Sequence, residues 1–380
     1  MKKIAIIGGG AAGMVCAVIL ARNGLNVTVF ERGERLGRKL SATGNGQGNV
    51  TNVNMDGTHY FSDDPEKVKT ALLKFSAKDT VRFLEELGGI FLADSRGRVY
   101  PAGRQASAIT DLLRKELERL HVELRLSTPV TDLVHKSDRF SVVSSGGTQC
   151  FDAVVLAAGG CAAPNFGTDG SAYALAKRFS HTVTPCSPAL VQLKTLPEQV
   201  RGLKGIRVDG AIRLLRNRQT VYGVRGDVLF TESGLSGDAV FKTSSYAKTG
   251  DTVEIDLLPD VSFERLEHVL SHGDGADCLL CVVNNGLGRV LYRRANGNRQ
   301  TLATLLKAFP CTVTGTLGFS HAQVTRGGIS LSEVDDHLMS RFCKGLYFAG
   351  EILNVDGECG GYNLQWAFTS AHLVAEGILC

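Results

Sequence analysis

Both ends of the chain show the same spacing of apolar and polar positions. An apolar run over residues 3–7 predicts a buried strand, helical spacing over residues 11–23 predicts a helix, and a second apolar run over residues 26–30 predicts the next strand. Near the other end, residues 346–376 repeat this style with a strand, a long loop and a last helix. We therefore predict one α/β domain with a parallel sheet, assembled from both ends of the chain.

The central part of the chain has other patterns. Helical spacing is found over residues 65–88, 105–120 and, for the most part, 262–309. Short strands are expected over residues 121–155, and strand character returns over residues 311–317. The alternation from Pro188 to Leu258 is typical of antiparallel strands.

These patterns predict a doubly wound nucleotide-binding domain that is interrupted by a β-rich substrate domain and a small helical domain. The expected boundaries are residues 1–187 plus 325–380 for the nucleotide-binding domain, 188–258 plus 310–324 for the β-rich insert, and 259–309 for the helical domain.

Composition and charge exclude several classes of protein. A net charge of +4 over 380 residues gives no case for binding nucleic acid or a membrane surface by bulk electrostatics. No run of 18 apolar residues is present, so we expect no membrane span, and the first apolar run breaks too early for a signal peptide. We therefore expect a cytoplasmic protein.

The ten cysteines are scattered without a framework spacing, and we expect free thiols. Cys278 and Cys281 form a C-x-x-C, but no second pair or histidine cluster accompanies it. We predict no metal site.

The first turn of the chain matches a dinucleotide-binding fingerprint. Gly8, Gly10 and Gly13 satisfy G-x-G-x-x-G between a strand and a helix. Gly8 allows the tight turn, Gly10 lets the backbone approach a pyrophosphate, and Gly13 lets the helix pack on the strand. Ala11 and Ala12 begin the helix, whose first N–H groups favour phosphate.

The second strand ends in Glu31, which is placed to accept hydrogen bonds from the adenosine ribose hydroxyls, with Arg32 beside it as a further cofactor contact. FAD and NAD both use this arrangement, so other segments must distinguish them.

The segment after the second strand favours FAD. The basic pair Arg38 and Lys39 leads into a loop with Gly44, Asn45 and Gly46, which suits a chain that wraps a pyrophosphate and reaches a flavin. A solvent loop is the alternative, because glycine and asparagine favour turns.

Two later segments add expected cofactor contacts. The strand that ends in Ala158 and Gly159 resembles a nucleotide-side motif of FAD-dependent reductases, and Val130 lies where such proteins contact adenine. Near the C-terminal end, Glu351 is placed for a ribityl hydroxyl, and a glycine turn then opens a helix toward the flavin N1–C2=O edge. The residues expected to contact the cofactor in this last segment are Gly350, Glu351, Asp356, Gly361, Tyr362, Asn363 and Leu364. No histidine lies within residues 38–52 or 350–365, so we expect the FAD to be non-covalent.

With these segments in place, the chain resembles the BaiN/RdsA (YhiN-like) flavoproteins, often labelled NAD(P)/FAD-dependent oxidoreductases or aminoacetone oxidase-like. The resemblance covers nearly the whole chain and is carried by Gly8–Gly13, Thr43–Gly46 with Asn49, Thr51 and Asn52, Val99–Pro101, Leu229–Gly237, Val324–Ile329 and Gly345–Phe368. The chain departs from the family where Glu232 replaces a usual His and Asp238 a usual Pro, and Gln47, Gly48, Glu358 and Cys359 are also atypical.

The resemblance implies a Rossmann-like FAD-binding domain, a β-barrel insert and a small helical domain. One branch of the family is associated with reduction of 3-oxo-Δ4 steroids. Only one dinucleotide fingerprint is present, so NADH or NADPH is expected to dock transiently. We therefore expect hydride transfer from NAD(P)H through flavin N5 to a small or polycyclic carbonyl or enone acceptor.

Two other functions remain open. An RNA-modifying or RNA-binding flavoprotein is compatible with a pI of about 8.5, but no basic stripe with interleaved aromatics supports it. The other open function is that of a flavin-bound sensor without turnover.

Four residues are candidates to line a substrate pocket between the flavin and the insert. Arg326 is expected to hold a carbonyl or carboxylate, with a structural ion pair as the alternative. His321 is a candidate proton donor, although a lone histidine is more often structural. Arg104 and Tyr362 complete the set.

Overall fold

The fold comes from a computed structural model, which describes residues 2–272 and 275–380. The chain divides into two compact units. Unit 1 consists of Met1–Pro188 and Val324–Cys380, and unit 2 consists of Ala189–Gln323. Each unit is described by itself.

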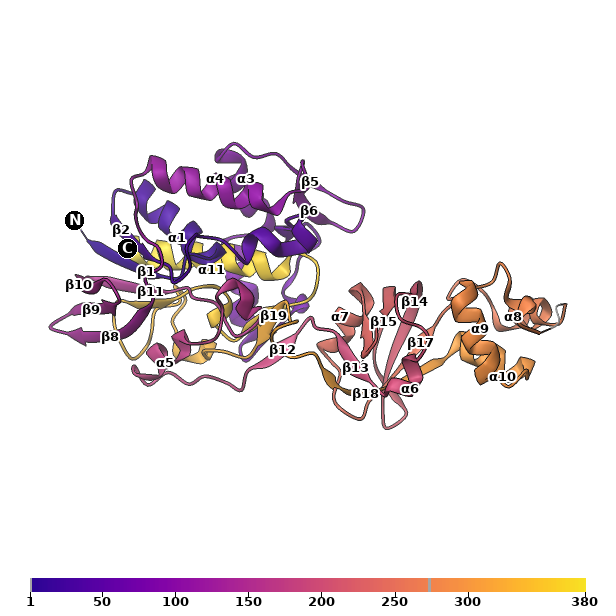
Figure 1. The fold of residues 1–380 in the computed structure, drawn as a ribbon. Helices are drawn as coiled ribbons and strands as arrows, with labels where there is room; N and C mark the ends of the chain where they lie inside the picture. The colour runs from indigo at the N-terminus through magenta and orange to yellow at the C-terminus, as the bar shows by residue number, and fades with distance from the viewer. Residues whose placement is uncertain (1, 273–274) are drawn as a thin grey trace. The chain divides into compact units, whose positions relative to one another are not determined.

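A five-stranded parallel sheet forms the centre of unit 1 (Figure 1). Its order is β20 (Leu346–Phe348), β11 (Ala153–Leu156), β1 (Lys3–Ile7), β2 (Asn26–Phe30) and β7 (Glu123–Arg125). The inner strands β1 and β11 and the strand β20 are short apolar runs because they are buried, whereas β7 at the other edge is polar and largely exposed. The Rossmann-like fold predicted from both chain ends is confirmed.

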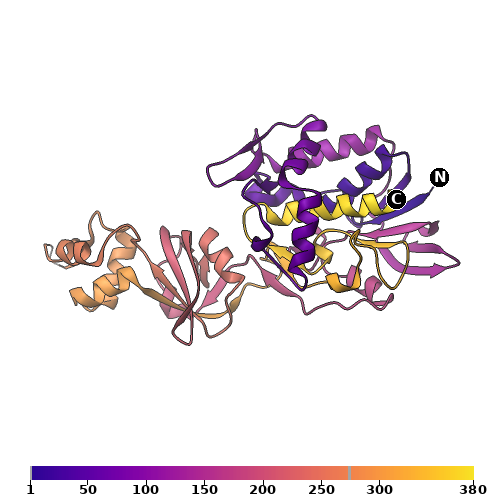
Figure 2. The same ribbon diagram turned by 180° about the vertical axis from the view of Figure 1, so that it is seen from behind.

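Three helices pack together beside this sheet: α1 (Ala11–Arg22), α4 (Ala106–Arg119) and α11 (Tyr362–Leu379). Helix α11 is apolar along most of its length because it packs against α1, and most of its residues are buried. Figure 2 shows the two chain ends side by side, and the ammonium of Lys2 donates to the carbonyl of Ile378 at 3.0 Å. The two halves of the chain therefore share one core.

The expected helix over residues 65–88 is wrong as a single element. The structure has α2 (Pro65–Lys74) and α3 (Ala77–Glu86), separated at Phe75. Ser76 and Asp79 form a capping box, which satisfies the backbone N–H groups at the start of a new helix. The expected helix over residues 105–120 is confirmed as α4.

The remaining elements of unit 1 are short. The strands are β3 (Thr51–Asn52), β4 (Tyr60–Ser62), β5 (Phe91–Ala93), β6 (Arg98–Pro101), β8 (Val130–Lys136), β9 (Arg139–Ser144), β10 (Gly147–Phe151), β19 (Val324–Arg326) and β21 (Val355–Gly357), and β12 (Ser187–Ala189) ends at the boundary of the unit. The helical turns are η1 (Leu40–Gly46), η2 (Gly57–His59), η3 (Pro164–Phe166), α5 (Ala172–Lys177), η5 (Leu331–Glu333) and η6 (Gly350–Ile352). β21 pairs with β4 in antiparallel orientation, which brings residues 355–357 beside residues 60–62.

Unit 2 contains a closed barrel, which confirms the predicted β-barrel insert. Its strand order is β13 (Leu193–Thr195), β16 (Gly234–Ser236), β15 (Gln219–Phe230), β14 (Arg207–Arg216), β17 (Thr252–Asp256) and β18 (Phe309–Thr316). The helices are α6 (Pro197–Val200), α7 (Asp238–Ser244), α8 (Phe263–Leu270), η4 (Gly275–Leu279), α9 (Asn285–Arg294) and α10 (Arg299–Lys307).

Barrel and helices of unit 2 share one hydrophobic core, in which Ile255 and Phe309 of the barrel cluster with Leu266, Leu291 and Leu302 of the helices. The separation of residues 259–309 as a domain of its own therefore stays a prediction. Among the described residues, no helix is both long and apolar enough to cross a membrane.

Candidate functional site

The glycine turn between β1 and α1 has the geometry that the fingerprint predicts. Gly8 has a φ of +110°, and a Cβ there would lie 2.6 Å from the carbonyl oxygen of Ala157. A Cβ on Gly13 would overlap the carbonyl oxygen of Gly8. A Cβ on Gly10 would meet no atom within 4 Å. The chain is thus packed tightly at Gly8 and Gly13, while the space in front of Gly10 is open, as a pyrophosphate requires.

Glu31 lies beside this turn. Its carboxylate accepts hydrogen bonds from the backbone N–H groups of Gly9 at 2.9 Å and Gly33 at 2.7 Å. These bonds fix the carboxylate at the end of β2, and each oxygen keeps a lone pair with which a ribose hydroxyl can bond. Arg32 is used elsewhere, in an ion pair of 2.5 Å with Asp169.

The segment after β2 is a tight loop. Gly44, Asn45 and Gly46 all have positive φ angles, of 59°, 55° and 82°. Arg38 donates to the carbonyl of Asn165 at 2.8 Å, and the ammonium of Lys39 pairs with Glu351 at 2.5 Å. The basic pair is therefore held in place, and Lys39 reaches one of the predicted cofactor residues.

The C-terminal segment meets the glycine turn directly. A Cβ on Gly350 would lie 2.9 Å from the Cβ of Ala12, so the two predicted nucleotide segments are in contact. The second carboxylate oxygen of Glu351 accepts from the backbone N–H of Thr325 at 2.8 Å. Glu351 thus joins the loop after β2 to β19.

The start of α11 lies against the loop that follows Gly44. A Cβ on Gly361 would come within 2.5 Å of the carbonyl oxygen of Thr51, so only glycine fits there. Asn49 lies at the same place, and its side-chain oxygen is buried without a hydrogen-bond partner in the described part of the chain. A buried acceptor without a donor is costly, and a flavin imide N–H is a donor of the kind that it lacks.

These observations fit FAD. The carboxylate of Glu31, the open space at Gly10 and the unpaired oxygen of Asn49 would hold the adenosine ribose, the pyrophosphate and the flavin ring, in that order along the cofactor. Helix α11 would direct its first N–H groups toward the ring.

Other predicted cofactor residues have structural partners. Asn363 clasps the loop before α11 by accepting from the N–H of Gly357 at 2.8 Å and donating to its carbonyl at 2.7 Å. Gly159 has a φ of 75°, and Ala158, Val130 and Leu364 are half-buried. The contacts of these four residues with a cofactor stay predictions.

Arg326 is held on two sides. Its guanidinium pairs with Asp356 at 2.8 Å and lies 3.8 Å from the ring centre of Phe61. Asp356 is almost fully buried, and this burial raises the pKa of its carboxyl, against the opposing effect of Arg326. The ion pair that was the alternative for Arg326 is present, and it ties the guanidinium of Arg326 in β19 to Asp356 in β21, the strand that precedes α11.

Of the other three catalytic candidates, two lie in unit 1. The Tyr362 ring stacks on His59 at 4.5 Å, and burial raises the pKa of its hydroxyl to about 12, so that the hydroxyl stays protonated at neutral pH. Arg104 lies 4.2 Å over the ring of Tyr100 and donates to Gln47 at 3.2 Å. His321 lies in unit 2, in an exposed turn, so its role stays a prediction.

Sequence reasoning missed His59, Phe61 and the unpaired oxygen of Asn49. His59 and Phe61 are placed by the pairing of β21 with β4, which no local sequence pattern predicts. Asn49 belongs to a segment that the family resemblance includes, but its lack of a partner depends on the approach of Gly361 and is visible only in three dimensions.

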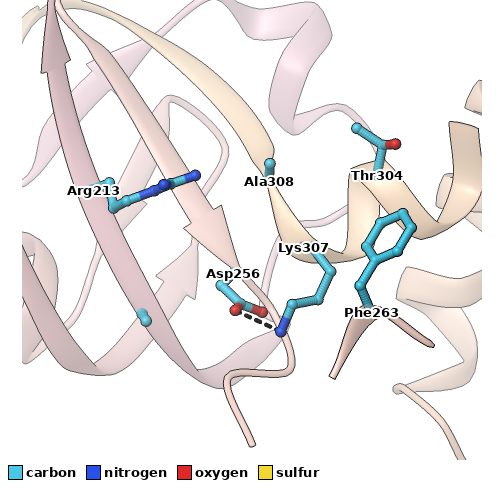
Figure 3. Close-up of a pocket in the computed structure, with 7 residues that line it drawn as sticks. Arg213, Asp256, Phe263, Thr304, Lys307 and Ala308 are labelled. Carbon is cyan, nitrogen blue, oxygen red and sulfur yellow. Dashed lines mark ion pairs between the residues drawn. The ribbon is translucent and has the colours of Figure 1, made fainter. Parts of the chain in front are cut away.

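An open pocket of about 420 Å³ lies within unit 2, and none of the residues that line it was predicted as a site residue from the sequence (Figure 3). Lys307 lines this pocket. Its ammonium pairs with Asp256 at 2.7 Å and donates to the carbonyls of Leu258 and Val261 at 2.8 Å each. All three N–H donors of this ammonium are thus used to hold α10 on the end of β17 and on the segment that follows it, and we assign no ligand to the pocket. Cys278, buried, and Cys281, exposed, are free thiols.

Comparison with known proteins agrees with this geometry. Residues 2–377 match the HI0933-like protein Rossmann domain. The chain belongs to this family. The HI0933-like match thus spans both units and confirms the resemblance found in the sequence.

Curated relatives of this HI0933-like chain cover almost its whole length. It is 34% identical to the 3-dehydro-bile acid delta(4,6)-reductase of Clostridium scindens, over 99% of this chain and 98% of the relative. It is 31% identical to the ribosomal RNA dihydrouridine synthase of Escherichia coli, over 98% of this chain and 97% of the relative. The chain is therefore an FAD-dependent oxidoreductase.

A solved structure shows the same fold at low identity. The 3-ketosteroid-delta4-(5alpha)-dehydrogenase of Rhodococcus jostii RHA1 aligns with a TM-score of 0.55 and 16% identity, over 98% of this chain and 96% of that one.

Proposed function

We propose that this chain is an NAD(P)H-dependent reductase that adds hydrogen across a carbon–carbon double bond conjugated to a carbonyl. FAD, when bound, supplies the hydride chemistry. The names of both curated relatives support this choice, because a delta(4,6)-reductase of a 3-dehydro bile acid and a dihydrouridine synthase both reduce such a bond.

The observation that carries the proposal is the position of Arg326. Through Asp356 it is tied to the segment that leads into α11, and its neighbour Thr325 is tied to Glu351 at the other end of that segment. A cation fixed there is suited to stabilise the negative charge that develops on the carbonyl oxygen during reduction. Asp356 and Phe61 keep the guanidinium in one orientation, so little reorganisation is needed when substrate binds.

Tyr362 is the second residue with a proposed role. Its hydroxyl stays protonated at neutral pH, so it can donate a hydrogen bond or a proton to the substrate. His59 stacks on the ring and restricts its rotation.

The test is anaerobic stopped-flow mixing of the FAD-loaded protein with NADH and with NADPH, followed by addition of a 3-oxo-Δ4 steroid. We expect the flavin absorbance to bleach with one nucleotide and to recover with the enone. If neither nucleotide bleaches the flavin, the proposed donor is wrong. If the flavin is bleached but addition of the enone does not restore its absorbance, the proposed acceptor class is wrong.

Reduction of uridine in RNA is the second candidate. The uracil ring has a C5=C6 double bond conjugated to its C4 carbonyl, so the same chemistry applies. The name of the Escherichia coli relative favours this candidate.

A further inference from the structure

Two cysteines of unit 1 lie beside the same short segment, residues 325–327. The backbone N–H of Cys161 donates to the hydroxyl of Thr325 in β19 at 2.7 Å. A Cβ on Gly327 would lie 3.2 Å from the Cα of Cys186. Both cysteines are free thiols and half-buried. The fold thus brings together two thiols that are far apart in the sequence.

The two thiols are close enough to influence each other. Burial raises the pKa of the Cys161 thiol to about 11, and the neighbouring Cys186 thiol adds to the rise through its charge and through hydrogen bonding. A like charge shifts a pKa in this way from within about 4–6 Å. Cys161 therefore keeps its proton at neutral pH, and Cys186 is the sulfur of the pair that would act first as a nucleophile.

Tyr173 of α5 closes one side of this pair. Its hydroxyl is buried, with no hydrogen-bond partner in the part of the chain that the structure describes. Burial raises the pKa of this hydroxyl, and Cys186, Glu351 and Cys161 raise it further. A Cβ on Gly170 would lie 2.6 Å from the Sγ of Cys161 and 3.3 Å from the ring of Tyr173. Sulfur and ring thus contact the same glycine, and the hydroxyl lies near both thiols.

The pair is joined to the predicted cofactor site. Cys161 comes soon after Ala158 and Gly159, two of the residues expected to contact FAD. Thr325, whose hydroxyl accepts from Cys161, donates its own backbone N–H to the carboxylate of Glu351 at 2.8 Å. A change in the position of Cys161 is therefore transmitted to two segments that are expected to hold the cofactor.

The C-x-x-C found in the sequence has other surroundings. Burial raises the pKa of the Cys278 thiol, and the charged groups that act on it are Arg299 and Asp277. Sequence spacing therefore directs attention to Cys278 and Cys281, whereas the fold places Cys161 beside Cys186.

We propose that Cys161 and Cys186 form a reversible disulfide when hydrogen peroxide oxidises them, and that this bond slows release of the cofactor. The inference goes beyond the proposed function and holds whichever substrate the protein reduces.

The oxidation takes place in two steps. The Cys186 sulfur attacks one oxygen of the peroxide, the O–O bond breaks, and the departing hydroxide takes up a proton to give water and a sulfenic acid. The Cys161 sulfur then attacks the Cys186 sulfur. The S–S bond forms as the S–O bond breaks, and the Cys161 proton leaves with the hydroxyl group as a second water. The two thiols lose two electrons, and the peroxide gains them.

The test uses the full-length, FAD-loaded protein, treated with a small molar excess of hydrogen peroxide. The remaining thiols are blocked with N-ethylmaleimide, and the protein is digested without reductant for mass spectrometry. The variants are C161S and C186S. The matched control is C150S, which removes an exposed thiol of the same unit. Circular dichroism and thermal melting establish that all three variants are folded.

We expect a linked pair of peptides that contain Cys161 and Cys186 in the unaltered protein and in C150S, and its loss after treatment with dithiothreitol. Dimedone, which traps sulfenic acids, should label Cys186 in C161S at least about tenfold more than Cys161 in C186S, because Cys161 keeps its proton. Oxidation to sulfinic acid without a linked peptide would overturn the proposal. So would linkage of either cysteine to Cys150 instead. Stronger labelling of Cys161 would overturn the order of attack.

A second measurement tests the effect on the cofactor. Release of FAD is followed by its fluorescence after dilution into flavin-free buffer. We expect the oxidised protein to release FAD at least about threefold more slowly than the reduced protein, because a cross-link restricts the open states through which the cofactor leaves. Peroxide should leave the release rate of C161S unchanged. A linked peptide together with an unchanged release rate in the unaltered protein would refute the effect on the cofactor.

Discussion

The substitution Gly10→Val tests the location of the cofactor. Without ligand, a Cβ at this position meets no protein atom within 4 Å, and the backbone of Gly10, at φ −79° and ψ −168°, is open to any residue. Valine should therefore cost the empty protein no more than about 1 kcal/mol, mainly because it is a poorer N-cap than glycine.

The cofactor should respond very differently. The valine methyl groups would fill the space in which the pyrophosphate approaches the first N–H groups of α1. Loss of two charge-assisted hydrogen bonds at about 1.5 kcal/mol each amounts to ~3 kcal/mol, or roughly a hundredfold in affinity. We expect protein purified with Gly10→Val to be colourless and folded.

The assay combines the flavin absorbance per protein with calorimetric titration of FAD into the empty protein and with denaturant unfolding. Gly13→Ala is the matched comparison, because its Cβ would overlap the carbonyl oxygen of Gly8. That variant should lose at least about 2 kcal/mol of stability even without FAD. Unchanged flavin stoichiometry in Gly10→Val would refute our placement of the pyrophosphate.

Three further predictions concern charged residues. Arg326→Ala should lower turnover of the enone at least about tenfold with flavin content unchanged; full turnover would make Arg326 purely structural, and lost flavin would place it in the cofactor shell. Lys39→Ala removes the partner of Glu351, and we expect titration of FAD to show about tenfold weaker binding; unchanged affinity would separate this pair from the cofactor. Hydrogen bonds from Arg119 and Arg22 lower the pKa of Glu116 to about 2, from 4.5 when unfolded, so their stabilising effect is present above pH 4.5 and is lost as the pH falls toward 2. Glu116→Gln should thus lower the free energy of unfolding by up to about 3 kcal/mol at pH 7 and much less near pH 2, and a loss independent of pH would contradict this.

The elements that could be predicted from the sequence are those whose signals are local. The β1–α1–β2 unit has its period, its glycines and its terminal carboxylate within 31 residues, and the structure reproduces each boundary to within one residue. The end of α2 at Lys74 was missed, although Ser76 and Asp79 have the spacing of a capping box. There the helical period on both sides outweighed a short capping signal.

The features that could not be predicted depend on long-range pairing. The order of the barrel strands and the approach of Gly361 to Thr51 join residues that are far apart in the chain. The same is true of Phe61, which reaches Arg326 only because β4 pairs with β21. Alternation of apolar residues predicts a strand but says nothing of its neighbour.

The parallel sheet of unit 1 contains strands from both ends of the chain, and this has a consequence during synthesis. Strand β20 and helix α11 leave the ribosome after every residue of unit 2, and without them β11 lacks a neighbour and α1 lacks the helix that covers it. The barrel has all of its strands between residues 193 and 316, so its folding does not have to wait for them. A nascent chain stalled before residue 346 should therefore hold a folded unit 2 and be unable to acquire flavin, which makes loading of the cofactor a checkpoint that only a full-length chain can pass.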